Sequence, residues 1–144
     1  MIKKLLTLSL SLFFINTMLA QNAIKGEWFT ADKGAKIKIY TCENDKICGK
    51  VVWLEEPNEE DSKPKTDINN PDSEHHDDPI IGMDLLKGFE KTDDDLWENG
   101  TIYDPNDGKT YKCKLTLESE DLLKVRGFIG FSLLGRTEEW TRVK

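Results

Sequence analysis

Hydrophobic and polar residues alternate along most of the chain after residue 22. In AKIKIYT, Ile37 and Ile39 fall on one face of an extended segment, and Lys36 and Lys38 fall on the other. The segment YKCKLTLE repeats this pattern. A period of two residues is typical of β-strands that bury one face and expose the other. The sequence therefore predicts a protein built from half-buried strands.

Turn-forming residues divide the alternating pattern into short segments. These turn signals are Asp32-Lys33-Gly34, Asn44-Asp45, Asn99-Gly100, Pro105-Asn106-Asp107-Gly108 and Ser119-Glu120-Asp121. Between them we expect eight strands, approximately at residues 26–31, 35–41, 46–54, 83–90, 95–103, 109–118, 121–129 and 135–143. Such antiparallel strands favour an all-β fold, a closed up-and-down barrel that leaves no exposed sheet edge. A two-sheet sandwich is the structural alternative.

A long polar segment, residues 55–82, interrupts the predicted barrel. Its second half, KTDINNPDSEHHDDPIIG, is dense in Asp, Asn, Glu and His. A connection of this length inside a compact domain is usually either functional or mobile. We therefore expect any site that lies outside the barrel to be found in this loop.

The first residues have the pattern of a secretory signal. Lys3 and Lys4 precede an apolar run, Leu5 to Ile15, and MLA precedes Gln21 as a cleavage site. The uncharged run is short compared with the roughly 20 residues that a membrane-spanning helix needs. We expect residues 1–20 to be a signal peptide and residues 21–144 to be one exported barrel domain, periplasmic or secreted, without membrane insertion of the mature chain.

The charge of the chain restricts its partners. Removing a signal that carries two lysines and no acid takes the formal net charge from −7 to −9. An acidic protein is repelled by nucleic acid and by an anionic membrane, so neither is expected as a partner. The same charge favours solubility, which is the simpler explanation.

The three cysteines predict one disulfide and one free thiol in an oxidising compartment. Cys42 and Cys48 flank the turn pair Asn44-Asp45, so a hairpin would place the two sulfurs opposite each other. Cys113 lies on the apolar side of its predicted strand, where a cysteine behaves as a small hydrophobe. No C-x-x-C motif is present, so dithiol redox chemistry is disfavoured.

Two residues at opposite ends of the predicted barrel are expected to meet. Trp28 lies in the first strand and Arg142 in the last. A barrel closed by pairing these strands brings both residues to one end, where a guanidinium stacked on an indole contributes roughly 0.5–2 kcal/mol. We therefore predict that Trp28 and Arg142 form a structural pair.

Several blocks of residues resemble known families. GEW together with Arg142 is similar to the G-x-W and Arg signature of lipocalins and other calycin barrels. CGKVVWL, DINNPD, GTIYDPNDGKTY, LKVRGF and GRTEEWTR, in this order, resemble the exported bacterial family known as domain of unknown function 2147. The resemblance implies export and a small calycin-like barrel, and it implies no established catalytic residues. After Asn-Pro-Asp the family tends to carry basic residues, whereas this chain has His75, His76, Asp77 and Asp78.

The polar loop offers two interpretations. Asp67, Asn69 and Asp72 carry the hard oxygen ligands that Ca²⁺ prefers, although their spacing does not match an EF-hand. His75 and His76 are adjacent, and adjacent residues in extended chain point apart, so a zinc site is disfavoured. The structural interpretation is that the short Asx side chains satisfy backbone groups of a loop laid across the barrel. We expect no cofactor, with a calcium ion in this loop as the alternative.

Catalysis has little support in the sequence. GFSLLG lacks the spacing of a G-x-S-x-G nucleophile elbow, and the two histidines lie together in one polar loop. Paired loop carboxylates of a glycosidase type remain an alternative, because many acids are present.

Aromatic residues raise the question of a ligand cavity. A barrel of about eight strands is just wide enough either to fill with side chains or to hold one small ligand. The candidate cavity-lining residues are Tyr40, Trp53, Phe89, Trp97, Tyr103, Tyr111, Phe128 and Phe131. We expect a non-catalytic barrel that binds a small apolar or amphipathic ligand. The alternatives are an envelope or stress interaction module with a filled barrel, whose protein partner is unknown, and an envelope hydrolase that uses loop carboxylates.

Overall fold

A computed structural model describes residues 23–144, and the predicted signal peptide, residues 1–20, lies outside them. The strands are β1 (Gly26–Phe29), β2 (Ala35–Thr41), β3 (Ile47–Leu54), β4 (Asp84–Asp93), β5 (Leu96–Asp104), β6 (Lys109–Ser119), β7 (Leu122–Phe128) and β8 (Gly135–Arg142). The helical elements of the described chain are two 3-10 turns, η1 (Glu43–Asp45) and η2 (Ser73–His75). Residues 23–144 contain no helix with the length and hydropathy needed to cross a membrane.

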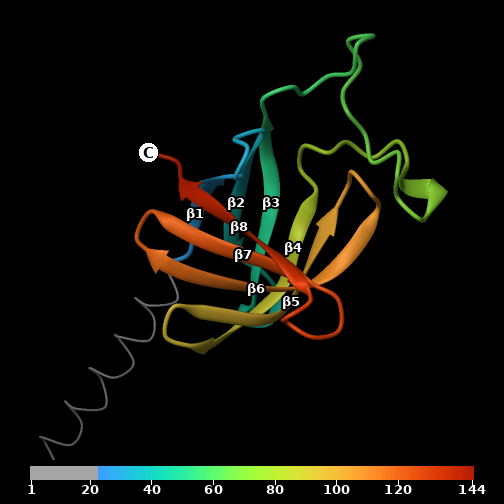
Figure 1. The fold of residues 1–144 in the computed structure, drawn as a ribbon. Coiled ribbons are helices and arrows are strands. Elements are labelled where there is room, and N and C mark those ends of the chain that lie inside the picture. The colour runs from blue at the N-terminus through green and yellow to red at the C-terminus, as the bar shows by residue number, and fades with distance from the viewer. Residues whose placement is uncertain (1–22) are drawn as a thin grey trace, which may run out of the picture.

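The strands form a closed barrel in chain order (Figure 1). Each strand pairs antiparallel with the one before it, and β8 pairs with β1 through Trp28 opposite Arg142 and Phe29 opposite Thr141. The predicted all-β, up-and-down barrel is confirmed, and the sandwich is excluded. The strand bounds differ from the expected ones by only a few residues, most at β4, which continues to Asp93.

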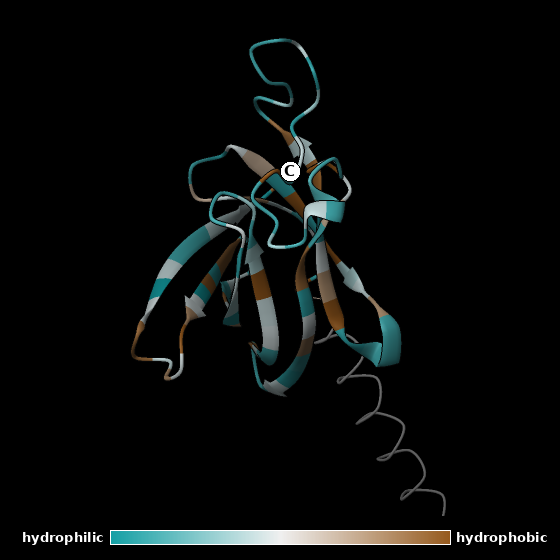
Figure 2. Ribbon diagram, turned by 90° about the vertical axis from the view of Figure 1, so that its right-hand side faces the viewer, coloured by the Kyte–Doolittle hydropathy of each residue, from teal (hydrophilic) through white to brown (hydrophobic). Residues whose placement is uncertain are grey.

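Side-chain alternation builds the core. The buried positions of the strands are almost all apolar, and exposed polar positions alternate with them, which gives the banded ribbons of Figure 2. Many core side chains, including Trp28, Phe89, Trp97, Leu115 and Leu123, have an exposed fraction of 0%. A void large enough for water would give its lining side chains accessible surface. The barrel interior around these residues is therefore filled with side chains.

Two glycines allow this close packing. A Cβ atom at Gly100 would lie 2.5 Å from the ring of Phe89, and one at Gly49 would lie 2.9 Å from a methyl group of Leu86. The expected turn at Asn99-Gly100 is wrong. Both residues lie inside β5, where the register with β6 shifts between Trp97 and Gly100 and Asn99 has a φ of 64°. The pair forms a β-bulge. Like a tight turn, a β-bulge suits an Asn with positive φ followed by Gly.

A disulfide closes the β2–β3 hairpin. Cys42 and Cys48 are bonded across η1, with their Cα atoms 5.8 Å apart. Asn44 and Asp45 both have positive φ, as the sequence favours for a tight turn. Cys113 is free and buried, and its burial raises the pKa of the thiol to about 12.

Candidate functional site at the 55–82 loop

The 55–82 loop projects from the barrel and then folds back onto it (Figure 1). Its two arms pair at an isolated bridge between Thr66 and Pro79. The backbone N–H of Ile80 donates to the carbonyl of Lys65 at 3.0 Å. The Ile80 side chain is buried and belongs to the core cluster. The returning half of the loop is therefore part of the fold.

Asp67 anchors this half of the loop to the barrel wall. It is the one charged or polar residue in the described chain that is buried, with 1% of its surface exposed. Its carboxylate accepts a hydrogen bond from the Tyr103 hydroxyl on β5 at 2.7 Å and one from the Asn70 amide at 2.7 Å. Desolvation and then the bond to Asp67 raise the pKa of Tyr103 to about 12. Both oxygens of Asp67 therefore serve a structural contact.

Asn69 makes a second attachment. Its side-chain amide donates to the carbonyls of Pro105 at 3.0 Å and Asn106 at 3.2 Å, in the β5–β6 turn. Gly108 closes this turn at a φ of +69°, and a Cβ atom there would overlap the carbonyl oxygen of Asn69. The loop and the turn therefore fit together only because residue 108 has no side chain.

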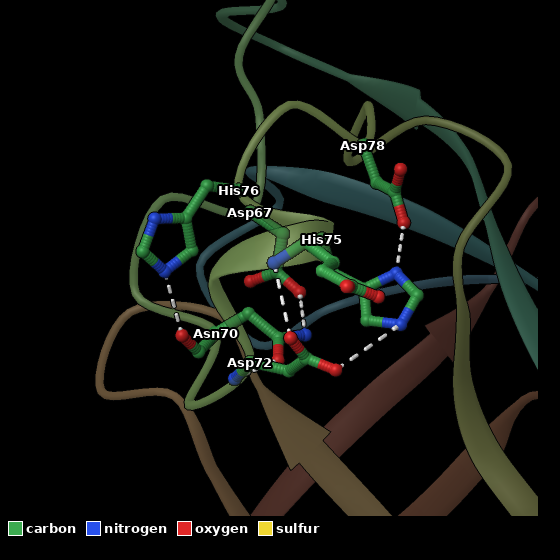
Figure 3. Close-up of polar contacts among 7 residues, drawn as sticks. Asp67, Asn70, Asp72, His75, His76 and Asp78 are labelled. Atoms are coloured by element: carbon green, nitrogen blue, oxygen red, sulfur yellow. Dashed lines mark hydrogen bonds and ion pairs between the residues drawn. The ribbon is translucent and has the colours of Figure 1, made fainter.

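The polar groups that follow form a self-contained network, drawn in Figure 3. The Asn70 side-chain oxygen accepts from the backbone N–H of Asp72 at 2.9 Å. Asp72 caps η2 by accepting from the N–H of Glu74 at 3.0 Å. His76 Nε2 lies 2.8 Å from the carbonyl oxygen of Asn70. These contacts are Asx turns and caps, as the structural interpretation of the sequence expects.

His75 lies between two carboxylates on the exposed side of the loop (Figure 3). Its Nδ1 is 2.7 Å from Asp78 Oδ2, and its Nε2 is 4.0 Å from Asp72 Oδ2. The hydrogen bond with Asp78 raises the pKa of the imidazole above its usual value, and the charge of Asp78 adds to this effect. The clamp formed by Asp72, His75 and Asp78 was not foreseen from the sequence, although the i, i+3 spacing on either side of His75 is a signal for it.

The three calcium candidates do not converge. Asp67 faces Tyr103 and Asn70, Asn69 faces the β5–β6 turn, and Asp72 caps η2. Throughout residues 23–144, no three His, Cys, Asp or Glu side chains are grouped so that they could hold a metal ion. In this structure Asp67, Asn69 and Asp72 each bond to a different backbone or side-chain partner, so they are not arranged as one set of ligands.

A shallow hollow lies beside the outer arm of the loop. It is open to solvent and is lined by Glu59, Glu60, Asp61, Lys63, Pro64, Thr66, Asp77 and Pro79. Lys63 lowers the pKa of Asp61 through its hydrogen bonds. A general acid of a glycosidase needs a raised pKa, so Asp61 does not suit that role.

The aromatic cavity candidates are dispersed. Phe89 and Trp97 are buried in the core. The hydroxyl groups of Tyr40, Tyr103 and Tyr111 bond to Asp84, Asp67 and Asp107. Aromatic type alone did not separate inward from outward positions. Tyr40, for example, alternates with the buried Ile39 and so faces outward.

The other three candidates are not part of the buried core. Trp53 is 38% exposed and packs edge-on against Phe29 on the outer wall, with their ring centroids 6.2 Å apart. Phe128 ends β7 and is half-buried, and Phe131 is 77% exposed in the β7–β8 loop. Trp53 and Phe131 therefore do not line the interior. The exposure of the β7–β8 loop was missed, although its run of apolar residues between glycines is visible in the sequence.

Comparisons with known proteins agree with this fold. A solved structure, described as "Protein HP1028 from the human pathogen Helicobacter pylori belongs to the lipocalin family", is similar to this chain with a TM-score of 0.67. It is 22% identical, and the alignment covers 76% of this chain and 73% of that one. No curated protein sequence matches the chain. The model of a bacterial family, described as "Uncharacterized protein conserved in bacteria (DUF2147)", matches residues 26–142, the whole barrel, and the chain therefore belongs to that family.

Proposed function

We propose that this chain is an exported, non-catalytic interaction module whose filled barrel carries the 55–82 loop as a binding element. One observation carries this proposal: the barrel interior is packed, with 0% exposure at residues such as Trp28, Phe89 and Trp97. A barrel of this size can hold a small ligand only if its interior is left open. The packed core therefore favours the filled-barrel alternative over the binding of a small apolar or amphipathic ligand.

The loop has properties that suit a recognition element. Its base is fixed to the barrel by Asp67 and Asn69, so a partner would meet a preorganised surface and little ordering entropy would be lost on binding. Its outer face carries exposed polar groups and the exposed side chain of Ile68. A rigid polar surface with one apolar anchor resembles the rim and core of a protein–protein interface.

Export is part of the proposal. The bond between Cys42 and Cys48 suits an oxidising compartment, and the N-terminal residues have the pattern of a secretory signal. Both observations support a periplasmic or secreted location.

Native mass spectrometry of the protein purified from its own envelope tests the filled barrel. We expect the mass of the protein without any ligand, and no added mass when apolar probes such as benzene are titrated into the sample. The variant Leu86→Ala serves as a positive control, because it removes a buried side chain and leaves a void that such a probe can enter. A lipid-sized mass bound one-to-one to the unaltered protein would contradict the proposal.

Photo-crosslinking in the intact envelope tests the loop. A photoreactive residue at Ile68 should give a defined protein adduct, and one at the exposed Lys87 on the barrel wall should not. Equal labelling from the two positions, or no adduct at Ile68, would remove the loop as the binding element.

A further inference from the structure

The β7–β8 loop presents an apolar tip to solvent. The exposed fractions are 68% for Ile129, 77% for Phe131, 89% for Leu133 and 67% for Leu134. In Figure 2 this tip is the brown end of a hairpin that projects from the barrel at the lower left. Single exposed apolar residues are ordinary, but a contiguous group of four marks an interaction surface.

The loop is held in this exposed form by its own backbone. The N–H of Ile129 donates to the carbonyl of Leu134 at 3.2 Å, and the N–H of Leu134 donates to the carbonyl of Phe131 at 2.9 Å. From the barrel wall, Arg126 Nε donates to the carbonyl of Ser132 at 2.7 Å. These bonds close the tip, so its apolar side chains point away from the core that they could otherwise join.

A positive surface leads up to the tip. On the outer faces of β6 and β7, Lys112 and Lys114 stand beside Lys124 and Arg126, between inward residues that are buried. Lys114 and Arg126 are directly opposite in the strand register. Like charges in such cross-strand positions repel each other, so this pair lowers the stability of the fold.

Little of this positive charge is neutralised within the protein. Lys124 forms an ion pair with Glu118 at 3.2 Å. Over residues 23–144, no carboxylate lies within ion-pair distance of Lys112, Lys114 or Arg126. In a chain with a net charge of −7, acids are plentiful, yet none pairs with these three cations.

One acidic segment lies far from the tip. Residues 55–61 include Glu55, Glu56, Glu59 and Glu60 in the projecting arm of the long loop. This arm is at the top of both Figure 1 and Figure 2, whereas the β7–β8 tip lies low in both views. Glu118 and Glu139 stand beside Lys124, and Asp104 acts on Arg136 next to the tip. The positive surface is therefore limited to Lys112, Lys114 and Arg126, which have no carboxylate at ion-pair distance within residues 23–144.

We propose that the β7–β8 tip and the adjoining positive wall bind the surface of an anionic lipid bilayer, with Phe131 and Leu133 entering the acyl boundary and Lys112, Lys114 and Arg126 facing the phosphate groups. Apolar side chains flanked by unpaired cations are the composition that interfacial membrane contacts use. The contact is peripheral, and the barrel remains outside the bilayer. It is separate from the 55–82 loop, so either proposal can fail without the other.

Vesicle binding tests the tip. The exported protein, with its N-terminus established by mass spectrometry, is sedimented with vesicles of phosphatidylcholine mixed with phosphatidylglycerol. Binding to the mixed vesicles is expected, and the double variant F131S/L133S should weaken it by about tenfold or more. Both side chains are exposed, so the variant should keep its thermal unfolding temperature. A variant that binds as well as the unaltered protein would overturn the proposal.

Two further measurements test the role of the lysines and the insertion of the tip into the bilayer. K112Q/K114Q should lose about fivefold in affinity per charge at low salt, whereas K38Q/K87Q, which removes two exposed lysines of β2 and β4, should change it little. In F131W the new indole is exposed, and its emission should shift to the blue when mixed vesicles are added.

Two outcomes would assign the tip to a different occupant. The first outcome is that the unaltered protein sediments as a dimer, the F131S/L133S variant sediments as a monomer, and neither binds vesicles. The tip would then be a self-association surface, and the lipid proposal would be wrong. If F131W shows no shift and binding is equal for mixed and pure phosphatidylcholine vesicles, the lipid proposal is wrong.

Discussion

The guanidinium of Arg142 stacks on the indole of Trp28, with its central carbon 4.2 Å from the ring centroid. The same group donates hydrogen bonds to the carbonyls of Ala23, Lys25 and Glu120 at 2.6, 2.8 and 2.7 Å. One side chain of β8 therefore joins the segment that precedes β1, the indole on β1 and the β6–β7 turn. Because β1 and β8 share only a short ladder, this contact reinforces the closure of the barrel.

Arg142→Ala should destabilise the fold by about 2–4 kcal/mol, because charged hydrogen bonds and the stacking contact are lost together. Arg142→Lys keeps the charge and one bond but not the planar fork, so it should recover only part of the loss. Urea unfolding followed by tryptophan fluorescence measures both. Thr141→Ala, at the exposed neighbouring position, is the control and should change the free energy of unfolding by less than about 0.5 kcal/mol. A similarly small effect of Arg142→Ala would show that closure depends on other contacts.

The sequence predicted this pair and most of the fold, because strand alternation and turn chemistry are local. It also predicted the hairpin disulfide. It misassigned Asn99-Gly100, since a positive-φ Asn-Gly pair suits both a turn and a bulge, and only the Phe89 ring packed on Gly100 decides between them. The predicted cavity-lining residues include outward-facing ones, because residue type does not indicate on which side of the barrel wall Trp53 or Tyr40 lies.

The candidate site was predicted in its location but not in its contacts. DINNPD was correctly interpreted as a segment that shapes a loop, because Asx side chains satisfy nearby backbone groups. The partners of Asp67 and Asn69 lie 36 residues away, on β5 and in the β5–β6 turn, and such pairings depend on the closed barrel. Sequence spacing alone gives no access to them.

The bond between Asp67 and Tyr103 should be a main anchor of the loop. Asp67→Ala leaves the Tyr103 hydroxyl and the Asn70 amide without their partner and should cost about 2–4 kcal/mol. A double-mutant cycle with Tyr103→Phe isolates the pair, and a coupling of about 1–2 kcal/mol is expected. Asp77→Asn, at an exposed loop position, is the matched control. Additive effects of the two changes would mean that the bond does not contribute to stability.

Gly108→Ala should detach the loop from the β5–β6 turn. The substitution combines a φ of +69° with an overlap between the new methyl group and the carbonyl of Asn69. Gly130 has the same φ of +69°, but a Cβ atom there would meet nothing within 4 Å, so Gly130→Ala isolates the backbone strain of about 1–2 kcal/mol. Hydrogen exchange should show faster amide exchange near Asn69 for Gly108→Ala only. Equal effects of the two variants would show that the β5–β6 turn adjusts to the new methyl group and that the loop stays in place.

The disulfide between Cys42 and Cys48 closes a loop with a sequence separation of 6 and should contribute roughly 2 kcal/mol through the unfolded chain. The double variant C42S/C48S should therefore unfold at lower urea concentration with little change in the folded spectrum. In the native protein, Cys113 should resist iodoacetamide, since the thiol is buried and its pKa is raised to about 12. Rapid alkylation of Cys113 under native conditions would show that β6 opens locally.

The His75 clamp should make the loop sensitive to pH. Asp78 raises the pKa of His75 in the folded protein above its unfolded value of about 6.5. The pairing therefore contributes fully below that unfolded pKa and is lost as pH rises through the higher, folded one. Titration of the imidazole by NMR should show a raised pKa that falls toward 6.5 in Asp78→Asn and stays raised in Asp77→Asn. Amide exchange around Asp78 should accelerate over the same pH interval, and a pKa unaffected by Asp78→Asn would show that the contact does not persist in solution.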